Sequence, residues 1–261
     1  MLDVQILGRT RVWRDGTEAD LGPPGQRALF GLLILAGGQP LTRQAMVEAL
    51  WPVEAPRAAA NILQTYAKRL RRCLEPGRLP RARSAALPAV ADGYAFAAED
   101  ATVDVLRFRQ SVRAARRAER IDDTTGALAA YGLALALWHG PPLADVPLLA
   151  AHPGVTALVV EHRQVVARYG ELMTAAGRST EVLAMLAEDA MRHPLDEAAQ
   201  ARLVRACHAA GQRARAFEVY RATRLRLAEE LGVDPAPDLV SAYRELLSGH
   251  RPVPVQRSPE G

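Results

Sequence analysis

Residues 61–72 hold seven side chains of the types that bind nucleic acid, and six of them are candidates for one site. Asparagine and glutamine can hydrogen-bond to adenine edges in the major groove of DNA, while arginine and lysine bind guanine edges or phosphates. The segment holds no glutamate or aspartate, although a helix face that only meets water usually mixes both charges. The segment therefore favours a surface that faces DNA over one that is merely solvated. Its members are Asn61, Gln64, Thr65, Lys68, Arg69 and Arg72.

Apolar residues recur through the same segment at helical spacing and predict a helix over residues 57–74. Leu63 and Leu70 lie seven positions apart and so share one face, which we expect to belong to the core. At about 100° per residue, Lys68 and Arg72 point roughly 140° and 180° away from Leu63. The basic side chains therefore lie opposite the buried face, where a partner can reach them.

Positive charge is concentrated in the N-terminal part of the chain. Residues 1–97 hold 13 basic and 8 acidic residues, a net charge of +5, whereas residues 98–261 hold 20 basic and 21 acidic residues. A basic region confined to one part of a protein is typical of binding to a polyanion. The charge alone fits a solvated helix face equally well. The order of the predicted elements is needed to distinguish such a face from a DNA-binding surface. Basic candidates beyond the cluster are Arg57, Arg81 and Arg83.

The elements that must position this helix are a small sheet and two earlier helices. Alternating apolar residues predict a strand over residues 2–6, followed by a second strand and a turn at residues 15–16. A helix is expected over residues 23–38, because prolines begin the segment and two glycines end it. Thr42 is a suitable N-cap for a short second helix that ends at Trp51. Two helices joined by a tight turn with glycine indicate a helix-turn-helix.

A hairpin is expected to close this region. Asp92 and Gly93 stand between the apolar segments 86–90 and 94–96, and an Asp-Gly pair in that setting is a strong hairpin signal. A small sheet, three helices and a closing hairpin make a winged helix-turn-helix. This fold uses one helix to read the major groove of DNA.

The second half of the chain carries a repeat with the tetratricopeptide period. Ala-Ala-Gly at residues 175–177 recurs at residues 209–211, 34 positions later, and each copy is expected to open a helix-turn-helix pair. We therefore expect a mainly α fold class. An N-terminal winged helix-turn-helix with small β-sheets should precede a C-terminal, all-α, tetratricopeptide-like helical domain.

With these elements in order, the chain resembles the Streptomyces antibiotic regulatory protein (SARP) family, whose DNA-binding domain is similar to that of OmpR-type response regulators. The matching stretches are residues 27–38, 46–51, 63–72 and 93–94, together with 127–144 and 225–239, which resemble the bacterial transcriptional activator domain of that family. The resemblance implies an OmpR-type winged helix over residues 1–97 and an activator domain over residues 98–247. A disordered tail is expected over residues 248–261.

The resemblance also implies a function. Such a protein is a sequence-specific transcriptional activator, pathway-specific for secondary metabolism such as antibiotic biosynthesis. It binds double-stranded promoter DNA as a homodimer on direct repeats and recruits RNA polymerase with its sigma factor. The wing departs from the family pattern, which usually has basic or hydroxyl side chains there, because residues 84–91 read Ser-Ala-Ala-Leu-Pro-Ala-Val-Ala. Either Arg81 and Arg83 replace a wing arginine at the minor groove, or the wing only packs against the helices.

Other classes of protein find little support in the sequence. Nucleophile-elbow, P-loop and H-E-x-x-H motifs are absent, and Cys73 and Cys207 are too far apart for a zinc ribbon. We expect no catalytic residue, no cofactor and no metal. A tetratricopeptide-like scaffold that binds protein but not DNA is the alternative.

Composition predicts a cytosolic protein from an actinobacterium. Neither a run of about 18 apolar residues nor a secretory leader is apparent, so no membrane contact is expected. Of the 33 basic residues only Lys68 is a lysine, and this bias, together with the many alanines, is typical of GC-rich codon usage.

Overall fold

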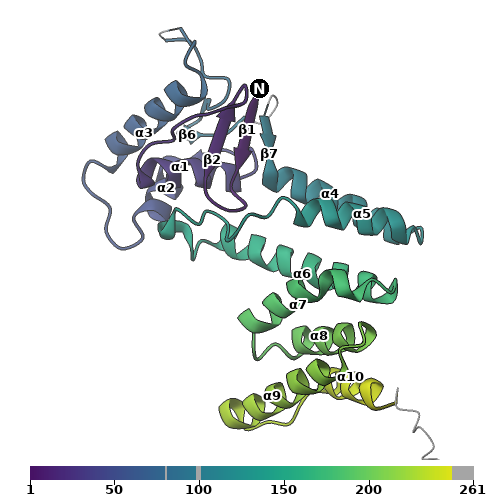
Figure 1. The fold of residues 1–261 in the computed structure, drawn as a ribbon. Helices are drawn as coiled ribbons and strands as arrows, with labels where there is room; N and C mark the ends of the chain where they lie inside the picture. The colour runs from purple at the N-terminus through teal and green to yellow at the C-terminus, as the bar shows by residue number, and fades with distance from the viewer. Residues whose placement is uncertain (80, 98–100, 249–261) are drawn as a thin grey trace, which may run out of the picture. The chain divides into compact units, whose positions relative to one another are not determined.

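Strands occur only within the first 103 residues of the described chain, and helices make up most of the rest (Figure 1). The computed structural model describes residues 1–79, 81–97 and 101–248. By packing, the chain divides into two compact units, Met1–His162 (the N-terminal unit) and Arg163–Gly261 (the C-terminal unit). The predicted fold class, mainly α with small N-terminal sheets and a helical C-terminal part, is confirmed.

The first sheet has four short strands in the order β3-β2-β1-β7. Strands β1 (Leu2–Gln5), β2 (Arg11–Arg14) and β3 (Thr17–Glu18) are antiparallel, so the two predicted strands and the turn that follows the second of them are confirmed. Strand β7 (Ala101–Val103) lies parallel to β1. Residues beyond 97 therefore complete the sheet with which the chain begins.

Three helices follow the first three strands: α1 (Pro24–Leu35), α2 (Arg43–Leu50) and α3 (Ala59–Leu74). Helix α1 has a proline in its first turn and is followed by Gly37, whose φ of +61° suits glycine and ends the helix. The Thr42 hydroxyl accepts a hydrogen bond from the Ala45 N–H at 3.1 Å, which confirms the predicted N-cap of α2. Helix α3 begins two residues after the predicted position 57.

The second sheet has three two-residue strands in the order β4-β6-β5, namely β4 (Leu41–Thr42), β6 (Gly93–Tyr94) and β5 (Ala89–Val90). The predicted hairpin is present, because β5 and β6 pair antiparallel across the loop residues Ala91 and Asp92. The left-handed residue of that loop is Ala91 (φ +49°) rather than the glycine. A Cβ on Gly93 would lie 1.8 Å from the Leu41 carbonyl oxygen, so glycine is needed for β4 to approach β6.

Helices α4 (Asp104–Glu119) and α5 (Thr124–Leu135) pack together, and with the short 3₁₀ helix η1 (Pro147–Leu149) they belong to the N-terminal unit. The Asp104 carboxylate accepts hydrogen bonds from the backbone N–H groups of Ile6 and Leu7, at 2.8 and 2.7 Å. The backbone N–H of His139 donates to the Leu7 carbonyl at 2.8 Å. These bonds tie the segment after residue 97 to the first sheet. The boundary expected between residues 97 and 98 is therefore not a boundary in packing, which divides the chain after residue 162. The boundary at residue 97 refers only to the functions expected of the two segments.

Helix α6 (Pro153–Ala175) runs across the division between the units, and the remaining helices are α7 (Ser179–Arg192), α8 (Glu197–Ala209), α9 (Arg213–Leu231) and α10 (Pro237–Ser248). Gly177 and Gly211 both adopt a φ of +74°, and each lies in the turn between two helices rather than at the start of a pair. Ser248 ends α10, so the predicted tail is wrong at that residue. Residues 249–261 of the predicted tail lie outside the described chain.

Candidate nucleic-acid interface

Helix α3 turns an apolar face to the core and a polar, basic face to solvent. Leu63, Ala67 and Leu70 are buried, as their spacing predicts, and α1 and α2 pack against the helix. All nine residues that the sequence predicts to bind DNA are exposed, so a duplex can reach each of them. They are Arg57, Asn61, Gln64, Thr65, Lys68, Arg69, Arg72, Arg81 and Arg83.

The structure places six of the nine residues on α3 and three on the segments beside it. Arg57 precedes the helix, while Arg81 and Arg83 lie in the loop that follows it. The Thr65 hydroxyl donates to the Asn61 carbonyl at 2.9 Å, which leaves the lone pairs of the hydroxyl oxygen available to a donor. The predicted site is therefore one helix face extended at both ends of the helix.

The basic side chains of this face are not neutralised by the protein. Within the part of the chain that the structure describes, Lys68, Arg69 and Arg72 form neither ion pairs nor hydrogen bonds through their side chains. In the C-terminal unit, by contrast, Arg178 pairs with Glu181 and Arg205 with Asp238, each at 2.7 Å. Cations without intramolecular partners are available to phosphates.

Glu75, the acid nearest in sequence to Arg72, forms hydrogen bonds with the loop that follows α3. The Glu75 carboxylate accepts hydrogen bonds from the Ser84 hydroxyl and from the backbone N–H groups of Ala85 and Ala86, the last two at 2.7 and 3.1 Å. These bonds fix the loop between α3 and β5 against the end of α3. Glu75 therefore shapes the loop that carries Arg81 and Arg83 instead of neutralising α3.

Two arginines that were not predicted as site residues hold α3 in place. The Arg71 Nε donates to the Leu87 carbonyl at 2.9 Å, and its guanidinium lies 5.2 Å from the centre of the Tyr94 ring. The Arg14 Nη1, from β2, donates to the Cys73 carbonyl at 2.8 Å near the C-terminal end of the helix. Arg71 falls on the edge of the apolar face in the helical pattern, but no local pattern indicates the role of Arg14.

The wing has no cation at its tip. Its loop consists of Ala91 and Asp92, both exposed, and Asp92 carries a negative charge that phosphates repel. Arg81 and Arg83 are the exposed cations of the preceding loop, and Arg81 adopts a left-handed φ of +68°. The structure thus leaves them as the candidates for a backbone contact on this side.

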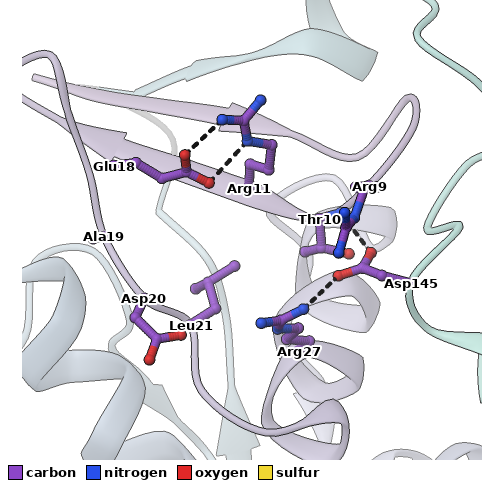
Figure 2. A pocket seen from close by; sticks show the side chains of 9 residues that line it. All are labelled: Arg9, Thr10, Arg11, Glu18, Ala19, Asp20, Leu21, Arg27 and Asp145. Atoms are coloured by element: carbon purple, nitrogen blue, oxygen red, sulfur yellow. Dashed lines mark hydrogen bonds and ion pairs between the residues drawn. The ribbon is translucent and has the colours of Figure 1, made fainter.

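A polar cleft beside the first sheet is drawn in Figure 2, and its charges balance. Arg11 pairs with Glu18 at 2.5 Å and Arg27 with Asp145 at 2.9 Å. Burial opposes ionisation of Asp145, but hydrogen bonds from the Thr10 backbone N–H and from Arg27 outweigh it and lower the pKa of Asp145. The cleft joins segments of the N-terminal unit and offers little net charge to a ligand.

Other kinds of site are not found in residues 1–79, 81–97 and 101–248. No group of three or more potential ligands there could hold a metal ion. No helix in these ranges is long and apolar enough to cross a membrane.

Comparisons with known proteins point to transcriptional regulation. The family described as the bacterial transcriptional activator domain matches residues 103–247. The regulatory protein AfsR of Streptomyces coelicolor is 34% identical over 243 residues, which cover 93% of this chain and 24% of AfsR. The transcriptional regulatory protein EmbR of Mycobacterium tuberculosis is 31% identical over 262 residues, 98% of this chain and 66% of EmbR. The chain thus spans about a quarter of AfsR and about two thirds of EmbR.

A solved structure is also similar. Mycobacterium tuberculosis EmbR in complex with a low-affinity phosphopeptide superimposes with a TM-score of 0.82 at 30% identity. The match covers 95% of this chain and 65% of the EmbR chain. The similarity therefore extends over nearly all of the sequence.

Proposed function

The chain belongs to the Streptomyces antibiotic regulatory protein family of transcriptional regulators, and from that premise we propose that it activates transcription by binding specific duplex DNA through α3. The observation that carries this proposal is the exposed face of α3, whose cations have no partner among the described residues. A family resemblance alone would leave open which surface binds. The α3 face supplies that surface.

The residues of the face divide by reach and chemistry. Asn61, Gln64 and Thr65 are short and lie in the first half of α3, the part of a recognition helix that meets base edges. Lys68, Arg69 and Arg72 in the second half hold phosphates or guanine edges. The flanking Arg57, Arg81 and Arg83 add phosphate contacts, which position the protein without reading sequence.

The family resemblance supports a further assembly step. Two copies bind side by side on a direct repeat of promoter DNA and recruit RNA polymerase with its sigma factor, so the protein works at the nucleoid. Identical modules in tandem enter successive major grooves, so half-sites lie about 10 base pairs apart on one face of the duplex. An insertion of about five base pairs between them should abolish activation.

In this scheme, residues 1–97 read DNA and residues 98–247 serve assembly and activation. The rival function is a tetratricopeptide-like scaffold that binds a protein segment and no DNA, which the helix pairs of the C-terminal unit favour. The two functions differ in whether the α3 face is needed. A scaffold retains its activity when the cations of α3 are removed.

The test first selects duplexes from a random pool with the full chain. Fluorescence anisotropy then measures the affinity of the full chain for the selected duplexes. If about five phosphates are contacted, log K should fall against log salt with a slope of roughly −4 to −5. The double variant Lys68→Ala/Arg72→Ala should bind more weakly and with a slope flatter by about 2. Arg221→Ala/Arg224→Ala, which removes two exposed arginines from α9, is the matched control. Equal binding by the two double variants contradicts the assignment of α3.

A further inference from the structure

The exposed face of α4 carries three arginines, a fourth follows at the C-cap of the helix, and none of the four has an acidic partner among the described residues. They lie at spacings of three, four and seven residues, so they share one face of the helix. All four are exposed, and none of their side chains forms an ion pair or hydrogen bond with a described residue. The four are Arg113, Arg116, Arg117 and Arg120.

No acid in the neighbouring described segments forms an ion pair with this cluster, although Asp122 and Asp123 lie in the turn that follows it, where Asp123 caps α5. Glu119 is the acid nearest in sequence, and its carboxylate accepts a hydrogen bond from the Tyr131 hydroxyl of α5 at 3.1 Å. Helix α5, which packs against α4, has no charged residue. Like charges at these spacings repel one another. The cluster therefore has an electrostatic cost that a bound polyanion would relieve.

Two simpler explanations account for only part of the pattern. The helix dipole favours cations in the last turn of α4, where Arg116 and Arg117 lie, but Arg113 precedes that turn. Arginine-rich composition affects the whole chain and also leaves Arg221 and Arg224 of α9 exposed without a described partner, but α4 and its C-cap carry four such arginines within eight residues. The concentration of unpaired arginines on α4 thus needs its own cause.

We propose that the α4 arginine face binds the phosphate backbone of the DNA that flanks the site read by α3. This proposal rests on the proposed function. The chemistry favours phosphates over an acidic protein surface, because phosphate contacts need only cations, whereas the cores of protein interfaces are depleted of charged residues. From Arg113 to Arg120 the helix rises by about 10 Å, which spans roughly three phosphates of one strand at about 3.4 Å each.

The position of α4 in the N-terminal unit favours flanking DNA. Helices α3 and α4 belong to the same compact unit, and in Figure 1 they lie at opposite sides of it, with the strands between them. The two basic faces are therefore separate surfaces, and α4 does not extend the face that reads bases. A duplex that runs past α3 meets α4 only beyond the base pairs that α3 contacts.

The test compares full-length chains on two duplexes, one trimmed to the selected site and one extended by about 15 base pairs on each side. The variant is Arg113→Ala/Arg117→Ala, with Arg221→Ala/Arg224→Ala as the charge-matched control. On the extended duplex, the variant should lose about two from the salt slope, because each phosphate contact contributes about 0.9. Between 50 and 200 mM salt the wild-type chain should then lose roughly tenfold more affinity than the variant. Arg113→Lys/Arg117→Lys, which keeps the charge, should restore the slope.

The outcomes separate this proposal from the assignment of α3. An effect confined to the extended duplex supports it. The proposal is overturned if the variant matches its control on both duplexes, or if it weakens binding equally on both. If Lys68→Ala/Arg72→Ala weakens binding while the α4 variant does not, the α3 function stands and the α4 proposal fails. If the wild-type chain binds no duplex, both fail together.

Discussion

Asp104 is the residue through which the segment after position 97 is fastened to the first sheet, and its removal has a predictable cost. Its carboxylate is buried and accepts hydrogen bonds from the N–H groups of Ile6 and Leu7. In Asp104→Ala both donors lose their acceptor in a buried place, and each unsatisfied donor costs about 1 to 3 kcal/mol. We therefore expect a loss of about 2 to 6 kcal/mol in the free energy of unfolding of the N-terminal unit. Asp104→Asn keeps an acceptor oxygen and should cost much less.

The same carboxylate predicts a pH dependence. Burial raises the pKa of Asp104 to about 6, against the opposing effect of the backbone N–H bonds from Leu7 and Ile6. Because folding raises this pKa, the folded state binds the proton of Asp104 more tightly than the unfolded chain does. The stability that this proton contributes is complete below about pH 4 and is lost as the pH rises through 6. Relative to Asp104→Asn, the wild-type chain should lose roughly 2.5 kcal/mol between pH 4 and pH 7.

Urea unfolding followed by tryptophan fluorescence measures both effects. The three tryptophans, Trp13, Trp51 and Trp138, all lie in the N-terminal unit, so the signal reports on that unit. A stability difference between wild type and Asp104→Asn that stays constant from pH 4 to pH 7 refutes the account of the pKa. An Asp104→Ala variant as stable as wild type refutes the account of the buried donors.

Three further predictions follow from individual contacts. Gly93→Ala places a Cβ against the Leu41 carbonyl oxygen, so it should lower stability by about 1 to 3 kcal/mol or more, and an unchanged melting temperature would contradict the tight approach of β4. Asn61→Ala or Gln64→Ala should cost about 1 to 3 kcal/mol on selected DNA and much less on random DNA, whereas equal losses in anisotropy titrations would show that these residues only position the protein. Phe217 is half-buried, and its ring centre lies 5.9 Å from that of Tyr243 in an edge-on arrangement. Phe217→Ala should therefore lower the free energy of unfolding by less than the roughly 3 to 5 kcal/mol typical of a buried ring. A loss of that full size in thermal unfolding would contradict the partial burial of the ring.

The local features of this fold could be predicted from the sequence because their causes are local. The faces of α3 follow from helical spacing, and the start of α2 follows from the hydroxyl of Thr42. The Asp-Gly pair predicts the hairpin in the right place, but Gly93 is needed for the close approach of the Leu41 carbonyl from a distant segment and not for the conformation of the turn.

Contacts between distant segments could not be predicted in this way. Strand β7 has three residues, too few to show a period, and Asp104 bonds to residues 97 and 98 positions before it. Arg14 reaches α3 from β2 by the same kind of long-range contact. The net charge of residues 98–261 does not indicate the arginine cluster of α4, because acidic residues elsewhere in this range balance it.

Dimethyl sulfate footprinting of the full chain on fragments of genomic DNA tests the central claim most directly, because this reagent modifies guanine N7 in the major groove. If two copies bind through α3, guanines are protected in two major-groove segments about 10 base pairs apart on one face of the duplex. The account also predicts that Lys68→Ala/Arg72→Ala removes this protection while Arg221→Ala/Arg224→Ala retains it. Protection that survives in the α3 variant, or no protection by the wild-type chain on any fragment, would contradict DNA recognition through α3.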